Sequence, residues 1–294
     1  MGLPPTFIQT DMLYTTYYAS AEPYRILYSN DDTLPIYPLL RSIDKTEYPI
    51  HLVSPEHGRS YVVGKRGDRY IVSKGNGLSY SPYAFINTKE LGSDTWGLLL
   101  QQDAVRDFIV GNEVRKLGIK TNHMEYVIEL DKYILLENGT QLKPVLLQYS
   151  VECPYRISDA AYMTHDEIML WVNKWDSMFP NDDVHHYQTA AEVLIRNLYI
   201  LQSRGILHNA ISSQNYTWAL ELLDFEIAHS PNYPYSSEDL QRHVMDLFTR
   251  EIIFTYQIIV SIAGILKEQI DFNWIDGVFA KYGFNIKQYN VSPK

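Results

Sequence analysis

The sequence predicts an α+β protein of two lobes, in which a β-rich lobe comes before a helical one. Residues 51–150 hold short runs of β-branched and aromatic residues that are separated by turn signals. Residues 151–294 instead hold three long segments with helical periodicity. A chain of 294 residues is long enough for two lobes with a substantial core. Residues 1–50 are rich in Tyr and Pro without a sustained period, so we expect an irregular N-terminal extension there.

The composition is that of a globular protein and excludes several classes of function. Hydrophobic residues make up 46% of the chain and charged residues 20%, which is wrong for a disordered protein. The net charge of −10 argues against general nucleic-acid binding, because proteins of that class carry a basic surface. The one cysteine, Cys153, has no partner for an internal disulfide and is expected to pack in the core.

No membrane span or secretory signal is expected. The apolar run Ile252–Leu266 is shorter than the roughly 20 residues that a span needs, and it contains Tyr256, Gln257 and Ser261. We therefore expect a buried core helix at this position. The N-terminal residues have no basic flank before an apolar run, so a cytoplasmic location is expected.

The β-rich lobe is expected to begin with a hairpin that ends in a lysine. Tyr61–Val63 and Tyr70–Val72 are strand-like runs, and the GKRGD segment between them has the residue types of a turn. Lys74 closes the second strand, where its ammonium could bind a phosphate. Gly75 and Gly77 follow, and glycines let backbone N–H groups approach an anion closely. The plain alternative is a solvated surface lysine.

After a loop at residues 78–102, residues 103–116 have the pattern of a helix. Asp107 lies in the middle of its apolar face, at about 100° per residue. A buried carboxylate is rare unless it is paired, so Asp107 requires a cation, and Lys74 is a candidate. The other candidate acid of this helix, Glu113, lies about 120° round the axis, so the two acids cannot face one site.

Two strand segments and then three helices complete the predicted order. Residues 124–130 and 132–151 have strand character, and Asn138-Gly139 in the second is the strongest hairpin signal in the chain. The helices are expected at residues 165–179, 189–205 and 240–269.

The non-helical stretch between the last two helices, residues 205–228, carries a candidate metal site. Asn215 and Asp224 stand at the two ends of a short apolar ribbon, so an amide oxygen and a carboxylate could meet on one cation. Mg²⁺ prefers such oxygen ligands. The alternative is that Asn215 is a turn residue and that Asp224 caps the next element.

In chain order, these features are a strand lysine, a helix acid, a linker, helices, a loop asparagine and a ribbon aspartate. That is the order found in a protein kinase. The sequence therefore predicts a bilobal protein-kinase-like fold, with one central helix in the β-rich lobe. It has no HRD triplet, and Asp224 is followed by Phe-Glu rather than Phe-Gly.

Two segments resemble the selenoprotein-O family of kinase-like protein adenylyltransferases. They are KGNGLSYSPYAF, which starts at Lys74, and AVRDFIVGNEVRKLGIKTN, which starts at Ala104. The likeness continues in PYRIS and in an Asn followed nine residues later by an Asp, and it covers residues 57–228 in short matches. The resemblance implies a transferase that uses ATP and Mg²⁺ to attach AMP to hydroxyl groups of an unknown protein substrate.

The resemblance also implies roles for single residues. Arg59 matches an arginine of the family's nucleotide loop, and Lys74 would bind phosphate and pair with Asp107. Arg156, in PYRIS, matches an arginine that contacts phosphate. The loop asparagine and the ribbon aspartate described above would hold the metal.

The chain departs from that family at the position of its catalytic acid, where it has Gln214. An amide cannot serve as a base near neutral pH, so an active protein would be slow or would recruit His208 from the same loop. Two alternatives stay open: an ordinary kinase of proteins or small molecules, and a catalytically weak pseudokinase that binds nucleotide or a partner protein. Gln214 favours the pseudokinase.

A second cluster of possible metal ligands is formed by Asp182, Asp183, His185 and His186. No other ligand set with the spacing of a structural zinc site accompanies it, so a solvated loop is expected. The 24 tyrosines show no stacking motif with interleaved basic residues, so binding of nucleic acid is not expected.

Overall fold

The computed structural model describes residues 16–42, 46–54, 57–77, 97–135, 139, 141–175 and 185–289. The chain forms two compact units. The first consists of Met1–Asn112 and Asn122–Tyr155, and the second of Glu113–Thr121 and Arg156–Lys294. The division at Arg156 is near the expected position, whereas no feature of the sequence signalled that Glu113–Thr121 belongs to the second unit.

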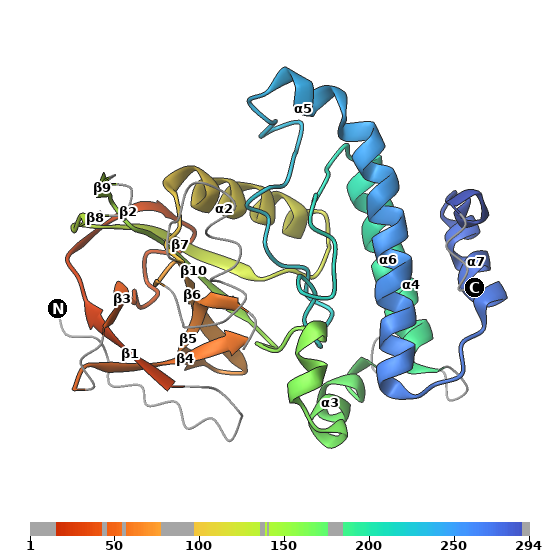
Figure 1. Ribbon diagram of the computed structural model, residues 1–294, viewed down its shortest axis with the longest axis horizontal. Helices are drawn as coiled ribbons and strands as arrows, with labels where there is room; N and C mark the ends of the chain where they lie inside the picture. The colour runs from red at the N-terminus through yellow and green to blue at the C-terminus, as the bar shows by residue number, and fades with distance from the viewer. Residues whose placement is uncertain are drawn as a thin grey trace. The chain divides into compact units, whose positions relative to one another are not determined.

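The first unit is built on an antiparallel sheet. Among the described residues eight strands join it, in the order β2-β7-β10-β6-β5-β4-β1-β3 (Figure 1). Their bounds are β1 Thr16–Ala21, β2 Tyr24–Ser29, β3 Leu39–Ser42, β4 Tyr48–Ser54, β5 His57–Arg66, β6 Arg69–Lys74, β7 His123–Leu130 and β10 Val145–Val151. A separate ribbon pairs β8, Ile134–Leu135, with β9, Gln141–Leu142. Of the hairpin signal Asn138-Gly139, Asn138 lies outside the described residues.

The prediction of an irregular extension at residues 1–50 is wrong for the part that the structure describes. Four strands, β1 to β4, begin there and belong to the sheet. β1 lies between β3 and β4, and β2 pairs with β7 at the opposite edge. Their buried residues Ala19, Leu39 and Ile50 join one apolar cluster with Tyr61 of β5. Short strands with partners distant in sequence have little local periodicity, so the composition did not reveal them.

The hairpin predicted before Lys74 is present. β5 pairs with β6 as far as Arg66 and Arg69, and Gly67 in the turn has a left-handed φ of 56°. β6 is a central strand between β5 and β10, and its last four residues, Ile71–Lys74, are buried. Lys74 therefore lies inside the unit with 2% of its surface exposed, which excludes a solvated surface lysine.

The helix predicted after the loop is α2, Gln101–Lys116. Figure 1 shows it lying along the strands of the sheet, and Phe108 packs against Tyr28 of β2 with 5.8 Å between the ring centroids. The helix ends before Gly118, whose φ of 83° is typical of a residue that follows a helix. This packing places Asp107, in the middle of α2, against the sheet.

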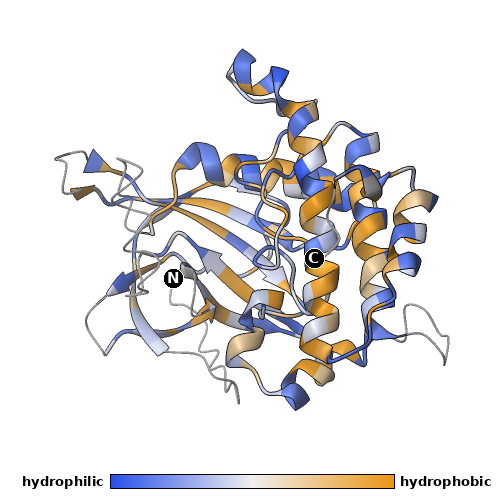
Figure 2. Ribbon diagram, turned by 45° about the vertical axis from the view of Figure 1, so that its right-hand side comes forward, coloured by the Kyte–Doolittle hydropathy of each residue, from blue (hydrophilic) through white to orange (hydrophobic). Residues whose placement is uncertain are grey.

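The second unit is helical. Its elements are the 3₁₀ helix η1 Ile157–Tyr162, α3 His165–Val172, α4 His186–Ser203, α5 Glu238–Arg242, α6 Val244–Leu266, α7 Phe272–Lys281 and the 3₁₀ helix η3 Ile286–Tyr289. α4 and α6 lie side by side (Figure 1), and in Figure 2 the hydrophobic colour follows these two long helices. The segment predicted as one helix at residues 240–269 is divided at His243 into α5 and α6.

α6 contains the apolar run predicted as a core helix. By length and hydropathy it is the one helix among the described residues that could cross a membrane, but a core helix passes the same test. Half of its apolar window is buried inside the unit. Ile259, Ile262 and Ala263 are fully buried. We therefore describe α6 as a core helix of the second unit.

Candidate functional site

The first unit contains the ion pair that the helix-face argument predicts. Lys74 Nζ lies 2.9 Å from Asp107 Oδ2, and the two side chains are 3% and 1% exposed. Glu113, the alternative partner, instead accepts hydrogen bonds from Ser230 Oγ at 2.5 Å and Asn232 Nδ2 at 2.7 Å. The pairing of Lys74 with Asp107 rather than Glu113 is confirmed.

The glycines after Lys74 do not form the anion cradle that the sequence suggested. The Gly75 N–H donates to the carbonyl oxygen of Arg59 at 2.8 Å, and the Gly77 N–H donates to that of Gly97 at 3.4 Å. Both N–H groups are therefore used inside the first unit. Arg59 itself lies on β5 with its side chain partly buried, and its contact with a nucleotide stays a prediction.

Gly75 is required for a different reason, which is the close approach of β10. Its φ is 99°, and a Cβ atom added there would lie 2.5 Å from the carbonyl oxygen of Val145 and 2.8 Å from Leu99 Cβ. We expect Gly75→Ala to lower the free energy of unfolding by about 2–4 kcal/mol, through left-handed strain and overpacking together. Chemical denaturation measures the loss.

Gly67→Ala is the matched control for this prediction. Its φ of 56° is also left-handed, but an added Cβ would meet nothing within 4 Å. We expect it to cost about 1–2 kcal/mol, which is the strain of the backbone alone. Equal losses at Gly75 and Gly67 would show that the approach of β10 is not what requires a glycine at 75.

The loop that carries His208 is packed into the second unit. The fully buried His208 ring makes a hydrogen bond from Nε2 to the carbonyl oxygen of Leu223 at 2.8 Å, and its Nδ1 accepts the N–H of Ala210 at 3.2 Å. These partners require a neutral ring that is protonated on Nε2. The ring also meets Phe225 edge-on, with 5.0 Å between centroids. Both ring nitrogens are therefore bonded within the unit, and the recruitment of His208 as a base stays a prediction.

His208 and Asn215 have the spacing of the histidine and asparagine in the kinase catalytic loop, H-R-D-x-x-x-x-N. In this register Ala210 stands where a kinase has its catalytic aspartate. Sequence reasoning missed the register because only a contiguous HRD triplet was sought. The signal that could have found it is the distance from His to Asn, followed by Asp224-Phe225.

The ribbon predicted between Asn215 and Asp224 is present. The Thr217 N–H donates to the carbonyl oxygen of Glu221 at 3.0 Å, and the Leu223 N–H donates to that of Asn215 at 2.9 Å. Asp224 follows the ribbon with a φ of 69°, in the left-handed region that residues other than glycine rarely adopt. Backbone strain of this kind is concentrated at functional sites.

Arg156 does not point into an open phosphate site. The residue is 2% exposed, and its Nη1 donates to the carbonyl oxygen of Gln214 at 2.5 Å and to Asn215 Oδ1 at 3.2 Å. These contacts lie within the second unit and hold the loop that ends at Asn215. The phosphate contact that the family resemblance implies for Arg156 is not among these bonds, and it stays a prediction.

The hydrogen bond from Arg156 Nη1 to Asn215 Oδ1 bears on whether Asn215 and Asp224 fit a magnesium ion. A directly bound Mg²⁺ lies about 2.1 Å from its ligand oxygen. On Asn215 Oδ1, a metal would therefore lie within about 5 Å of the Arg156 guanidinium. At an effective dielectric constant of ~20, charges of +1 and +2 at that distance repel by roughly 6–7 kcal/mol. The residues present do not fit a metal bound through Asn215.

Glu251 of α6 anchors the loop and was not identified from the sequence. Its Oε1 accepts the backbone N–H of Asn209 at 2.6 Å. Burial raises the pKa of Glu251 to about 8, although hydrogen bonds from the backbone of Asn209 and His208 oppose the rise. Near neutral pH the carboxyl group is therefore mostly protonated. The signal that could have found it is an acid directly before the apolar run Ile252–Leu266.

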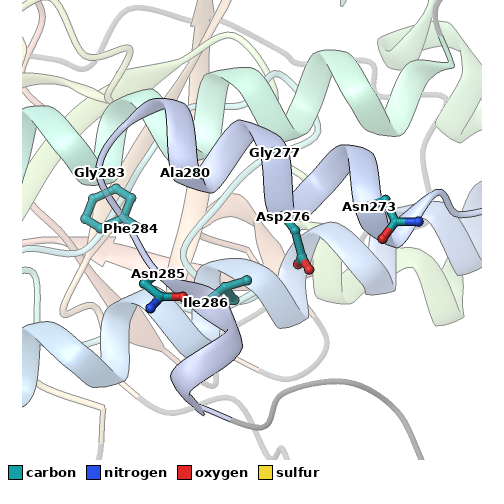
Figure 3. Close-up of a pocket in the computed structure, with 8 residues that line it drawn as sticks. All are labelled: Asn273, Asp276, Gly277, Ala280, Gly283, Phe284, Asn285 and Ile286. Atoms are coloured by element: carbon teal, nitrogen blue, oxygen red, sulfur yellow. The ribbon is translucent and has the colours of Figure 1, made fainter.

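Two hollows of the second unit differ in the residues that line them. A groove of about 510 Å³ is lined by the loop from Ala210 to Asn215 and by residues of α6. A cavity of about 550 Å³, shown in Figure 3, is lined by α7 and the segment after it. This cavity has Asp276 as its one ionisable lining residue and none of the candidate site residues. Of the candidate site residues, Gln214 and Asn215 line the loop groove.

The remaining candidates have structural partners. Cys153 is buried, and its Sγ makes a weak hydrogen bond to the carbonyl oxygen of Tyr155 at 3.5 Å. His186 Nδ1 lies 2.8 Å from Glu268 Oε1. Asp182 and Asp183 lie outside the described residues. Within the part of the chain that the structure describes, no group of three or more His, Cys, Asp and Glu side chains could hold a metal ion.

Comparison with known proteins gives likeness of structure alone. No protein-family model matches the sequence, and no curated protein matches it. The kinase domain of a rhoptry antigen specific to Toxoplasma gondii has a TM-score of 0.39 at 10% identity, over 82% of this chain and 77% of that one.

A second similar structure is ROP2 of Toxoplasma gondii, described as a virulence factor with a protein-kinase fold and no enzymatic activity. It has a TM-score of 0.35 at 11% identity, over 88% of this chain and 78% of that one. Both TM-scores are below 0.5. The kinase-like α+β fold follows from the chain's own elements: a β sheet with a buried lysine–acid pair, and a helical unit with a His…Asn loop before Asp-Phe.

Proposed function

We propose that this protein is a kinase-like module that has lost the transfer reaction and acts as a binding or regulatory protein. The observation that carries the proposal is the lack of a base in the loop. Ala210 stands at the kinase position, Gln214 stands at the adenylyltransferase position, and both nitrogens of His208 are bonded. A general base contributes about 10²–10⁴-fold to such a reaction.

ATP is the small-molecule ligand that we propose. The buried pair of Lys74 and Asp107 supports it, because a strand lysine held by a helix acid is a component of the kinase nucleotide site. The sequence has no G-x-G-x-x-G segment, and the N–H groups of Gly75 and Gly77 bind protein carbonyls. We therefore expect ATP to bind more weakly than it binds an active kinase.

Two enzymatic alternatives have distinct products. AMP transfer to a protein hydroxyl is the one favoured by the KGNG and AVRDFIVGNEVRKLGIKTN segments, and in it the α-phosphorus is attacked and pyrophosphate leaves. In a kinase reaction the γ-phosphorus is attacked and ADP leaves. In either reaction the attacking hydroxyl must lose its proton, and the loop provides no carboxylate at either expected position.

Intact mass spectrometry after incubation with ATP and Mg²⁺ tests the proposal, with the protein alone and with casein as an acceptor. We expect no mass increment on either protein, while ATP raises the melting temperature of this one. An adenylate-sized increment would establish AMP transfer, and a phosphate-sized increment would establish a kinase; either result sinks the proposal. Asp224→Asn is the control, because a signal that survives this change comes from a contaminating enzyme.

A further inference from the structure

Arg156 and Asn215 are placed against each other by backbone pairing within the second unit. Arg156 forms an antiparallel bridge with Thr217 of the ribbon. The next residue, Ile157, donates its N–H to the carbonyl oxygen of Tyr216 at 2.9 Å. This pairing delivers the guanidinium to the end of the ribbon where Asn215 begins, and it leaves Arg156 2% exposed.

The Asn215 amide is oriented by two partners of opposite kind. Its Nδ2 donates to the carbonyl oxygen of Ala210 at 2.9 Å, and its Oδ1 accepts from Arg156 Nη1 at 3.2 Å. The two bonds fix which end of the amide faces the guanidinium. The oxygen, which is the atom that would bind a metal, therefore lies beside a positive charge that arginine does not lose in proteins.

We infer that the Arg156 guanidinium takes the place of the metal at Asn215, so that this loop is closed to divalent cations. The inference rests on the proposed function in one respect: the kinase-like register of the loop puts Asn215 and Asp224 at the positions where a kinase has its metal ligands. Mg²⁺ demands near-ideal octahedral geometry and sheds water reluctantly, so it does not compete for a buried oxygen beside a cation. A nucleotide bound here is held without the metal bridge that kinases use.

Titration with Mn²⁺ alone, followed by electron paramagnetic resonance, tests the inference. We expect the wild-type protein and Asp224→Asn to give the same titration, because neither has a cation site at this loop. Arg156→Gln keeps an N–H donor for the carbonyl oxygen of Gln214 but has no charge. We expect it to gain one Mn²⁺ site at least ~100-fold tighter than any in the wild type. Adding Asp224→Asn to that variant should remove the site.

Arg156→Lys is the matched control, since it keeps the charge and should gain no site. If circular dichroism shows that Arg156→Gln does not fold, Asn215→Asp with Arg156 intact answers the same question. Its new carboxylate should pair with the guanidinium, and no Mn²⁺ site should appear.

Three results would overturn the inference: a wild-type Mn²⁺ site that Asp224→Asn abolishes, a folded Arg156→Gln without a site, or a Mn²⁺ site in Asn215→Asp. The proposed function fails by a different result, which is a mass increment from ATP. The two failures are therefore distinguishable.

Discussion

Replacing Lys74 by Met is expected to lower the free energy of unfolding by about 3–5 kcal/mol. The Lys74 Nζ lies 2.9 Å from Asp107 Oδ2, and both side chains are almost fully buried. Met has a similar length, so the main loss is the charge, and the Asp107 carboxylate stays buried without its ammonium partner. Urea-induced unfolding followed by circular dichroism measures the change.

Lys74→Met combined with Asp107→Leu is the control for this prediction. Replacing both members of a buried ion pair by apolar residues is often neutral, whereas removing one member is costly. We therefore expect the double variant to recover most of the lost stability, with a coupling free energy of ~2 kcal/mol or more in the double-mutant cycle. Additive losses would mean that Lys74 and Asp107 do not depend on each other, and the kinase-like assignment of the pair would lose its support.

The Lys74–Asp107 pair could be predicted because each member carries a local signal. A lysine that ends an apolar strand and an acid inside an apolar helix face are both uncommon unless they are paired. The helix period then separates Asp107 from Glu113, since the two acids point in different directions. In the structure Glu113 binds Ser230 and Asn232, as this geometry allows.

Contacts between distant segments could not be predicted in this way. β1 and β2 are short, and their partners lie in β3, β4 and β7, so their stability comes from pairing rather than from their own pattern. Arg156 and Asn215 are 59 positions apart. Nothing in the local sequence around PYRIS indicates that the Arg156 guanidinium donates to Gln214 and Asn215, because a guanidinium can donate to a carbonyl oxygen as well as to a phosphate.

Gly75 illustrates a different limit of sequence reasoning. A glycine permits the close approach of an anion and equally permits the close approach of another strand, because in both cases the missing Cβ is what matters. Only the position of the Val145 carbonyl oxygen distinguishes the two. Ala210 is a second example. It can be assigned to the position of the kinase catalytic aspartate only from its distance to Asn215 along the loop, because an alanine by itself carries no signal.

The stability of this protein is expected to fall between pH 5 and pH 8 through the titration of Glu251. Burial raises the pKa of this carboxyl group to about 8, from 4.5 for an exposed glutamate. When the pKa of a group is higher in the folded protein than in the unfolded chain, the group stabilises the fold fully at a pH below its unfolded pKa. This stabilisation is lost as the pH rises to the pKa of the folded protein. The contribution of Glu251 should therefore decrease by about 3–4 kcal/mol from pH 5 to pH 8. Urea unfolding at both pH values measures it.

Glu251→Gln isolates this contribution from that of other titrating groups. The amide cannot ionise, yet its oxygen can still accept the Asn209 N–H that Glu251 Oε1 binds at 2.6 Å. The informative quantity is therefore the difference between wild type and variant, which should be larger at pH 5 than at pH 8. A difference that does not change with pH would mean that Glu251 is ionised in the folded protein and holds the loop as a carboxylate.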